Sequence, residues 1–453
     1  MPGIESKLFD EIKVGDTASV QRTMLARDMQ AWASAFGDGF VPVREGAALD
    51  SAGIVTAVLC TLVNSALPGP GSSICSTAVQ IQVALPIDSP LTVRLVVQKK
   101  CADTGLITLT GECLDVKGKA VATAVLEVRA AATRKQCLMP EHRLENLVEQ
   151  CRGLKPILTG VVHPCSTEAL VGAVEASDAG LIVPVLFGPE AKLRQLAEAA
   201  MLDLSKCRIV TTANAEESAF RAAMAAGNNE IQALMKGSLH SDVFLHAVMQ
   251  KESKLRTGRL LSHCVLLSVP SYARRVVLTD AALNIAPDTD QKRDICQNAI
   301  GFAIALGIRL PKVAVLAAIE LVNTKMPASL DGAILAKMAE RRQIVGGIVD
   351  GPLDLDAAVD TEAARIKNIV SPVAGSADVL LAPNIEAANM IYKDLGFMAD
   401  AQSAALVVGA RVPIILTSRA DSAASRLYSA AAAVLYANAL VCDAANILPD
   451  PAE

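Results

Sequence analysis

Most of the chain after residue 156 alternates short apolar runs with helical segments, and this rhythm constrains the fold more than any other feature. Runs such as "LTGVVHP" (158–164) and "IVPVLFGP" (182–189) are each followed by a helical pattern. Apolar runs without polar alternation predict parallel strands that are buried on both faces. The sequence from this point on therefore predicts a doubly wound α/β region.

The first 130 residues follow a different pattern. A short capped helix is expected over 28–38 and a longer apolar helix over about 47–66, ending at "PGPGS". Four strand-like segments follow, among them "LTVRLVVQKK" and "AVATAVLEVRA", and turn signals separate them. One helix followed by an antiparallel meander predicts an α+β domain. The expected organisation is a domain over 1–132, a helical linker over 133–153 and an α/β domain over 154–453.

Composition excludes several classes of protein. The net charge of −5 does not favour a nucleic-acid binder. Eleven cysteines without a C-x-x-C pair argue against a zinc site and a disulfide framework. The N-terminal residues lack the apolar core of a signal peptide, and no window reaches the roughly 18 apolar residues of a membrane span. We therefore expect no metal, no membrane partner and a cytoplasmic location.

The segment "VVLTDAALNIAPD" (276–288) begins as a buried strand and then turns polar. It delivers Asp280, Asn284 and Asp288 just beyond the strand. Ligands in open α/β sheets bind beyond the carboxyl ends of strands. These three side chains are therefore predicted to line a binding cleft.

Polar residues also follow other predicted strands. His163, Ser166 and Thr167 stand at a helix start, where backbone N–H groups favour an anion, although Ser166 taken alone is better explained as an N-cap. Cations and hydroxyls occur in "LMKGSLHSD" and "KLRTGRLLSH"; they are Lys236, Ser241, Arg256 and Arg259. Guanidinium groups bind phosphate through paired hydrogen bonds, but a solvated helix face explains such segments as well.

A further candidate cluster follows the apolar run "VPIIL". Ser418, Arg419, Asp421 and Ser422 leave this run together in "TSRADS". A hydroxyl, a guanidinium and a carboxylate at such spacing suit phosphate binding and proton handling. The alternative is a capped helix start, with Asp421 and Ser422 in the capping positions.

Taken in order, the segments "MKGSLHS", "LRTGRLLSH", "VLTDAALNIAPD", "SPVAGSADVLLAPNIEAANMIYK" and "TSRADS" resemble the phosphate acetyltransferase and phosphate butyryltransferase family. The resemblance covers roughly residues 154–440. It implies a two-subdomain α/β fold similar to isocitrate and isopropylmalate dehydrogenases, usually dimeric. It also implies reversible transfer of a short acyl group from acyl-CoA to inorganic phosphate.

The beginning of the chain resembles a MaoC-type hot-dog domain, in which a sheet wraps a central helix. Such domains often hydrate enoyl-CoA through an Asp and a His in a "D-x-N-P-x-H" motif. The matching stretch here is "GDGFVPVRE", where Asp38 is retained and Arg44 stands at the His position. No histidine precedes His142, so the resemblance predicts a hot-dog domain without hydratase chemistry.

The family resemblance also implies roles for individual residues. Ser418 would stabilise the oxyanion, Arg419 would bind phosphate, and Arg256 or Arg259 would hold phosphate or a phosphate of CoA. The acetyl-type branch has an acid seven positions after the serine, where this chain has Ser425. Asp421, or alternatively Asp280, is therefore the candidate base.

Other functions remain open at this point. The alternatives are a non-catalytic acyl-CoA-binding regulatory protein, an enoyl-CoA hydratase acting through the first domain and, with least support, a nucleotide-dependent dehydrogenase. For the transferase we expect no cofactor beyond the CoA thioester substrate. We expect no nucleic-acid partner and a homodimer or a higher even oligomer.

Overall fold

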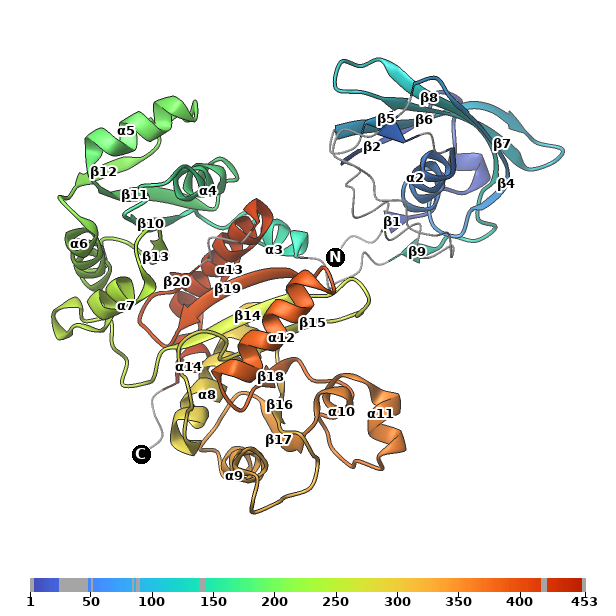
Figure 1. The fold of residues 1–453 in the computed structure, drawn as a ribbon. Helices are drawn as coiled ribbons and strands as arrows, with labels where there is room; N and C mark the ends of the chain where they lie inside the picture. Colours follow the sequence, from blue (N-terminus) through green and yellow to red (C-terminus); the bar gives the residue numbers. More distant parts are fainter. Residues whose placement is uncertain are drawn as a thin grey trace. The chain divides into compact units, whose positions relative to one another are not determined.

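The chain divides into two compact units, residues 1–140 and residues 141–453 (Figure 1). The computed structural model describes residues 4–23, 48–49, 52–83, 85–86, 90–137, 144–416 and 422–449. Each unit has a hydrophobic core of its own.

The first unit is built on a five-stranded antiparallel sheet with the order β2-β6-β7-β8-β4. Its strands are β2 (Thr17–Thr23), β4 (Ser73–Ile81), β6 (Pro90–Cys101), β7 (Leu106–Leu114) and β8 (Ala120–Arg129). The remaining elements are short; they are β1 (Ile4–Glu5), η1 (Phe9–Glu11), β3 (Ala48–Leu49), β5 (Leu85–Pro86) and β9 (Gln136–Cys137). Strand β1 pairs with β9, and β3 pairs with β5.

The helix α2 (Ala52–Ser65) packs against this sheet, which curves around it (Figure 1). Leu59 and Val63 of the helix are fully buried against alternate residues of β6, β7 and β8. Gly111 of β7 makes the close approach possible, because a Cβ there would lie 2.7 Å from Leu59 Cδ2. A sheet wrapped around one helix is the hot-dog arrangement, so the expected fold of this region is confirmed. The expected helix 28–38 lies outside the described residues.

The second unit contains an eleven-stranded sheet with the order β12-β11-β10-β13-β20-β19-β14-β15-β18-β16-β17. Its strands are β10 (Ile157–Val162), β11 (Ile182–Gly188), β12 (Arg208–Thr211), β13 (Ala233–Lys236), β14 (Ser262–Ser268), β15 (Arg275–Thr279), β16 (Lys312–Leu316), β17 (Ile348–Leu353), β18 (Val379–Leu381), β19 (Gln402–Val408) and β20 (Ile414–Ile415).

Helices cover both faces of this sheet. The helices are α3 (Glu145–Gln150), α4 (Thr167–Asp178), α5 (Glu190–Ala199), α6 (Ala215–Gly227), α7 (Ser241–Met249), η2 (Lys251–Ser253), α8 (Thr289–Ala305), α9 (Pro327–Glu340), α10 (Leu355–Val359), α11 (Thr361–Ile366), α12 (Ile385–Phe397), α13 (Ala423–Cys442) and α14 (Ala444–Ile447). Successive residues of β10 belong to the cores on opposite faces of the sheet. Val161 packs with α4 and α13, and Val162 packs with α6 and α7. The predicted α/β class is therefore confirmed.

The sheet differs from the expected parallel one in its centre. Strand β14 is antiparallel to both neighbours, and β19 is antiparallel to β20. All seven residues of β14 are buried, so its sequence carries no polar alternation that would reveal its direction. Burial on both faces thus arises here in an antiparallel strand.

The segment expected as a helical linker over 133–153 does not form one continuous helix. Residues 136–137 form β9 of the first unit, and α3 spans only Glu145–Gln150 in the second. Leu144, Leu147 and Cys151 are buried in the main core of the second unit. The second half of this segment therefore belongs to the core of the α/β unit.

In the part of the chain that the structure describes, no helix has the length and hydropathy to cross a membrane.

Candidate functional site

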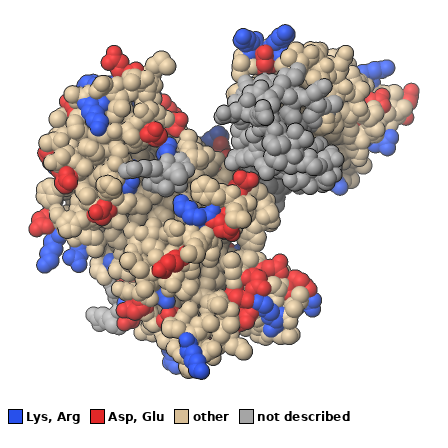
Figure 2. Space-filling model, in the orientation of Figure 1, with Lys and Arg blue, Asp and Glu red and all other residues tan. Residues whose placement is uncertain are grey.

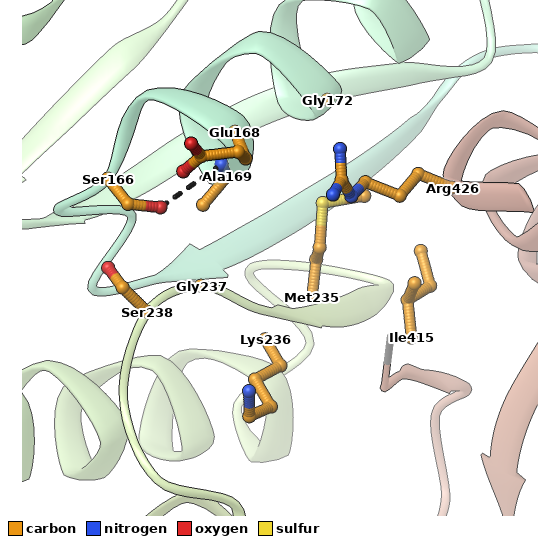
Figure 3. A pocket seen from close by; sticks show the side chains of 10 residues that line it. All are labelled: Ser166, Glu168, Ala169, Gly172, Met235, Lys236, Gly237, Ser238, Ile415 and Arg426. Carbon is orange, nitrogen blue, oxygen red and sulfur yellow. Dashed lines mark hydrogen bonds between the residues drawn. The ribbon is translucent and has the colours of Figure 1, made fainter. Parts of the chain in front are cut away.

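A pocket of about 420 Å³ opens at the carboxyl ends of β10, β13 and β20 (Figure 3). Parallel strands commonly present their ligand sites at this edge. The wall combines apolar side chains with two cations, two hydroxyls and a carboxylate. The lining residues are Ser166, Glu168, Ala169, Gly172, Met235, Lys236, Gly237, Ser238, Ile415 and Arg426.

Two strand ends are fixed to each other beside this pocket. Gly237 N–H donates to Val162 O at 2.9 Å, and the Ser238 hydroxyl donates to His163 O at 2.8 Å. Gly237 is required at this position, since a Cβ would lie 2.3 Å from Val162 O. His163 has a left-handed φ of 51°, which turns the chain from β10 toward α4. The pocket floor is therefore a rigid junction of two loops.

The amino end of α4 forms one wall. Ser166 is the N-cap, and its hydroxyl accepts from Ala169 N–H at 3.4 Å. This bond supports the capping interpretation of Ser166. Glu168 follows in the first turn, and its own backbone N–H, the Ser166 hydroxyl and the charge of Arg426 lower its pKa. His163 instead directs Nδ1 to Ser218 Oγ at 3.3 Å, and burial lowers the pKa of His163.

Arg426 reaches the pocket from the first turn of α13, opposite α4 (Figure 3). Gly172 makes room for it, because a Cβ on Gly172 would lie 3.1 Å from Arg426 Cδ. We did not anticipate Arg426 from the sequence. The available signal was its spacing: it follows the N-cap Ser422 by four residues, which is about one helical turn.

The predicted catalytic residues Ser418 and Asp421, together with Arg419, lie outside the described residues. They belong to the segment 417–421, which joins pocket-lining Ile415 to the helix that carries Arg426. Their roles stay predictions. Ser425 stands at the position where the acetyl-type branch is expected to have an acid. Its hydroxyl oxygen accepts a hydrogen bond from the Ser422 hydroxyl at 3.1 Å.

Lys236 lines the pocket, as expected for a substrate-binding cation. The other described candidates do not belong to the pocket's lining. Ser241 is the first residue of α7, and Asp288 is the N-cap of α8 in a capping box with Gln291. Asp288 Oδ1 accepts from Gln291 N–H at 2.8 Å, so its carboxylate is engaged in holding that helix.

Asp280 and Asn284 form a compact turn of their own. Asp280 Oδ1 accepts from the N–H groups of Ala282 and Leu283, both at 3.0 Å. Asn284 Nδ2 donates to Asp280 Oδ2 and, at 2.8 Å, to Leu261 O. Three antiparallel pairings separate β20 from β15, so β15 runs opposite to β13 and this loop leaves the sheet in the other direction.

Arg256 and Arg259 lie before the amino end of β14. Arg256 is exposed and forms an isolated bridge with Ala410. Arg259 is 8% exposed and donates to Pro449 O near the described end of the chain. The described structure does not bring either arginine together with Lys236 in the pocket, and their substrate-binding roles stay predictions.

An acidic cluster on α10 and its surroundings has the composition of a cation site. Glu320, Asp354 and Asp356 place carboxylate oxygens within 4.8 Å of one another. Lys367 Nζ supplies the cation: it lies 2.7 Å from Glu320 Oε1 and 2.9 Å from Asp356 Oδ1, and it also contacts Asp354. Figure 2 shows acidic side chains gathered with basic ones over α10 and α11. We therefore interpret this cluster as an ion-pair network.

The fold and the pocket define an α/β protein with a mixed-charge pocket at strand carboxyl ends, joined to a hot-dog unit. Residues 212–434 match the family model described as "Phosphate acetyl/butaryl transferase". The chain is 48% identical over 295 residues to the phosphate acetyltransferase of Rhizobium meliloti, covering 65% of this chain and 93% of that protein. The protein belongs to the phosphate acetyl/butyryl transferase family.

Other relatives agree with this assignment. The phosphate butyryltransferase of Clostridium acetobutylicum is 39% identical over 263 residues, covering 58% of this chain and 87% of that protein. A branched-chain phosphotransacylase from Enterococcus faecalis superposes with a TM-score of 0.56 at 28% identity, covering 62% of this chain and 99% of that one. The family model's match over residues 212–434 leaves out the first unit, whose hot-dog assignment rests on its own sheet order and central helix. Asp38 and Arg44, which bear on hydratase chemistry, lie outside the described residues.

Proposed function

We propose that the protein transfers a short acyl group from acyl-CoA to inorganic phosphate, reversibly, giving acyl phosphate and CoA. The single observation that carries the proposal is that six of the ten residues lining the pocket, its two cations among them, lie within the family-matched residues 212–434. Its cations Lys236 and Arg426 suit an anionic substrate, and Met235 and Ile415 offer apolar surface to a short acyl chain.

The protein must perform three functions in this reaction. Phosphate must be held, the oxyanion formed at the thioester carbonyl must be stabilised, and the leaving thiolate must be protonated. Ser418 is the proposed oxyanion donor, Arg419 the proposed phosphate ligand and Asp421 the proposed proton donor and acceptor. These three residues occupy the chain segment between Ile415 and Arg426.

Asp280 is a poorer candidate for the proton-transfer role, because its carboxylate accepts hydrogen bonds within its own turn. Direct attack by phosphate forms no acyl-enzyme and requires no organic cofactor or metal in the proposed scheme. Burial raises the pKa of Cys264 and of Cys296 to about 12, so these two thiols are unsuited to nucleophilic attack at neutral pH.

The proposal is tested by following free thiol in a mixture of protein, acyl-CoA and phosphate. Acetyl-, propionyl- and butyryl-CoA are compared, because relatives of both the acetyl and butyryl type occur. Ser418→Ala should reduce kcat by on the order of 10²–10³ while leaving KM nearly unchanged, since one preorganised oxyanion donor is removed. Unchanged kcat in this variant would show that the serine has no such role.

A non-catalytic acyl-CoA-binding regulator is the second candidate, and Ser425 is the feature that favours it. Tight acyl-CoA binding without thiol release would support that function.

We further propose a cytoplasmic location and a homodimer or higher even oligomer. Two apolar side chains two turns apart on α12, Met390 and Phe397, are 69% and 74% exposed and are the proposed contact surface for a second copy.

The hot-dog unit is proposed to lack hydratase activity, because no imidazole is available before His142 to position and deprotonate water. Incubation with crotonyl-CoA tests this directly. The conjugated enoyl absorbance should persist, whereas its loss would assign hydratase activity to this unit.

A further inference from the structure

The pocket contains a carboxylate that the proposed reaction does not use. Glu168, in the first turn of α4, lines the same wall as Ser166, and Arg426 approaches from α13 on the other side (Figure 3). Glu168 is exposed to solvent, so its side chain is free to change rotamer. Among the described lining residues, Glu168 is the acid and Lys236 and Arg426 are the bases.

Glu168 shares the pocket lining with groups of the kind that bind phosphate, namely the amino end of α4, the Ser166 hydroxyl and Arg426 (Figure 3). Its own backbone N–H at the start of α4, the Ser166 hydroxyl and the charge of Arg426 all lower the pKa of Glu168. Backbone N–H groups at helix starts and guanidinium groups are common phosphate ligands. The carboxylate of Glu168 therefore lies in the same pocket lining as the groups that an anionic substrate entering this pocket would contact.

We infer that Glu168 is an internal competitor of the anionic substrate, which neutralises part of the pocket when it is empty and must swing aside when phosphate or acyl phosphate binds. This inference rests on the proposed function of the same pocket. A role as the base for the CoA thiol fits less well, because a carboxyl whose pKa lies below its ordinary value accepts protons poorly from a thiol with a pKa near 8.5.

An acidic residue in the first turn also stabilises a helix, and the test must separate that effect from competition. Glu190 provides a matched control. It is the first residue of the neighbouring helix α5, pairs with Arg194 at 2.7 Å and lies outside the pocket lining. Glu168→Gln and Glu190→Gln thus remove the same charge from the first turn of a helix, and only Glu168 lines the pocket.

The experiment measures KM for phosphate, KM for acyl-CoA and kcat in both variants. Glu168→Gln should lower KM for phosphate about two- to fivefold, the size expected for one solvent-exposed charge interaction. Glu190→Gln should leave it unchanged. Arg426→Ala should raise KM for phosphate, and adding Glu168→Gln to it should then have a smaller effect than in the wild type, because the Glu168 carboxylate and phosphate compete for Arg426.

Two outcomes would overturn the inference. One is an unchanged or raised KM for phosphate in Glu168→Gln, and the other is a hundredfold loss of kcat, which would make Glu168 a catalytic residue. Calorimetric titration with inorganic phosphate keeps the inference separate from the proposed function. Tighter phosphate binding by Glu168→Gln is expected even if no thiol is released, and equal binding would refute competition.

Discussion

Asn284 donates its side-chain amide to Asp280 and to the carbonyl of Leu261, and thereby ties the loop after β15 to the start of β14. The most polar interruption of a buried strand in the sequence is thus a structural turn in the described structure. Asp280 is only 4% exposed, and backbone N–H groups surround its carboxylate.

Asp280→Ala should therefore lower the free energy of unfolding by about 2–3 kcal/mol, because buried N–H donors lose their acceptor. Asp288→Ala, which removes only the N-cap of α8, should cost about 1 kcal/mol. Urea denaturation of both variants measures the difference. A stable Asp280→Ala protein with no turnover would instead assign Asp280 to the chemistry.

The buried ion pair between Lys292 and Asp331 supports the packing of α8 against α9. Lys292 Nζ lies 2.6 Å from Asp331 Oδ2, and both side chains are almost inaccessible to solvent. Asp331→Ala should cost about 3–5 kcal/mol, because it leaves an uncompensated buried charge. The exposed pair Arg365 and Glu362 provides the control, and Arg365→Ala should have a far smaller effect on the free energy of unfolding, because solvent screens an exposed pair. Equal losses in chemical denaturation would contradict this account.

Lys367 should make stability depend on pH. Its hydrogen bonds lower the pKa of Asp356 to about 2 and lower the pKa of Glu320. Their contribution to stability is therefore fully present above the ordinary carboxyl pKa and is lost as the pH falls from there through the lowered pKa values. Burial raises the pKa of Asp354, which acts in the opposite direction. Lys367→Met removes the shared cation and leaves three carboxylates facing one another at neutral pH.

Thermal unfolding at two pH values tests this expectation. The melting temperature of Lys367→Met should fall by about 2–4 °C relative to wild type at pH 7. At pH 3 the difference should shrink, because the carboxyl groups are then largely protonated in the variant. An identical loss at both pH values would contradict the assigned role of the lysine.

The proposed dimer contact on α12, formed by Met390 and Phe397, can be tested by mutation. Phe397→Asp should convert the proposed dimer to a monomer, because it places a charge in an apolar contact. Val370→Asp is the control, since Val370 is fully exposed but lies outside α12. Light scattering after size-exclusion chromatography reports the mass of each species. A dimeric Phe397→Asp protein would place the contact elsewhere.

Most of the architecture could be predicted from the sequence, because apolar runs and helical periods follow directly from burial. The direction of β14 could not, since a strand buried on both faces has the same pattern in either direction. Arg426 could not be placed in the pocket from its spacing alone, because its position there depends on the packing of α13 against α4, where Gly172 leaves room for the side chain. Asp280 was predicted to line a binding cleft, but it accepts hydrogen bonds from its own turn. Polar residues after a strand predict a ligand site and such a turn equally well.

The most direct test of the central claim is the detection of acyl phosphate by ³¹P nuclear magnetic resonance in a mixture of the intact protein, acyl-CoA and inorganic phosphate. The account predicts a new acyl phosphate resonance that grows with one equivalent of free CoA thiol, and the reverse reaction from acyl phosphate and CoA. Free thiol without acyl phosphate, or no reaction with acetyl-, propionyl- or butyryl-CoA, would contradict it.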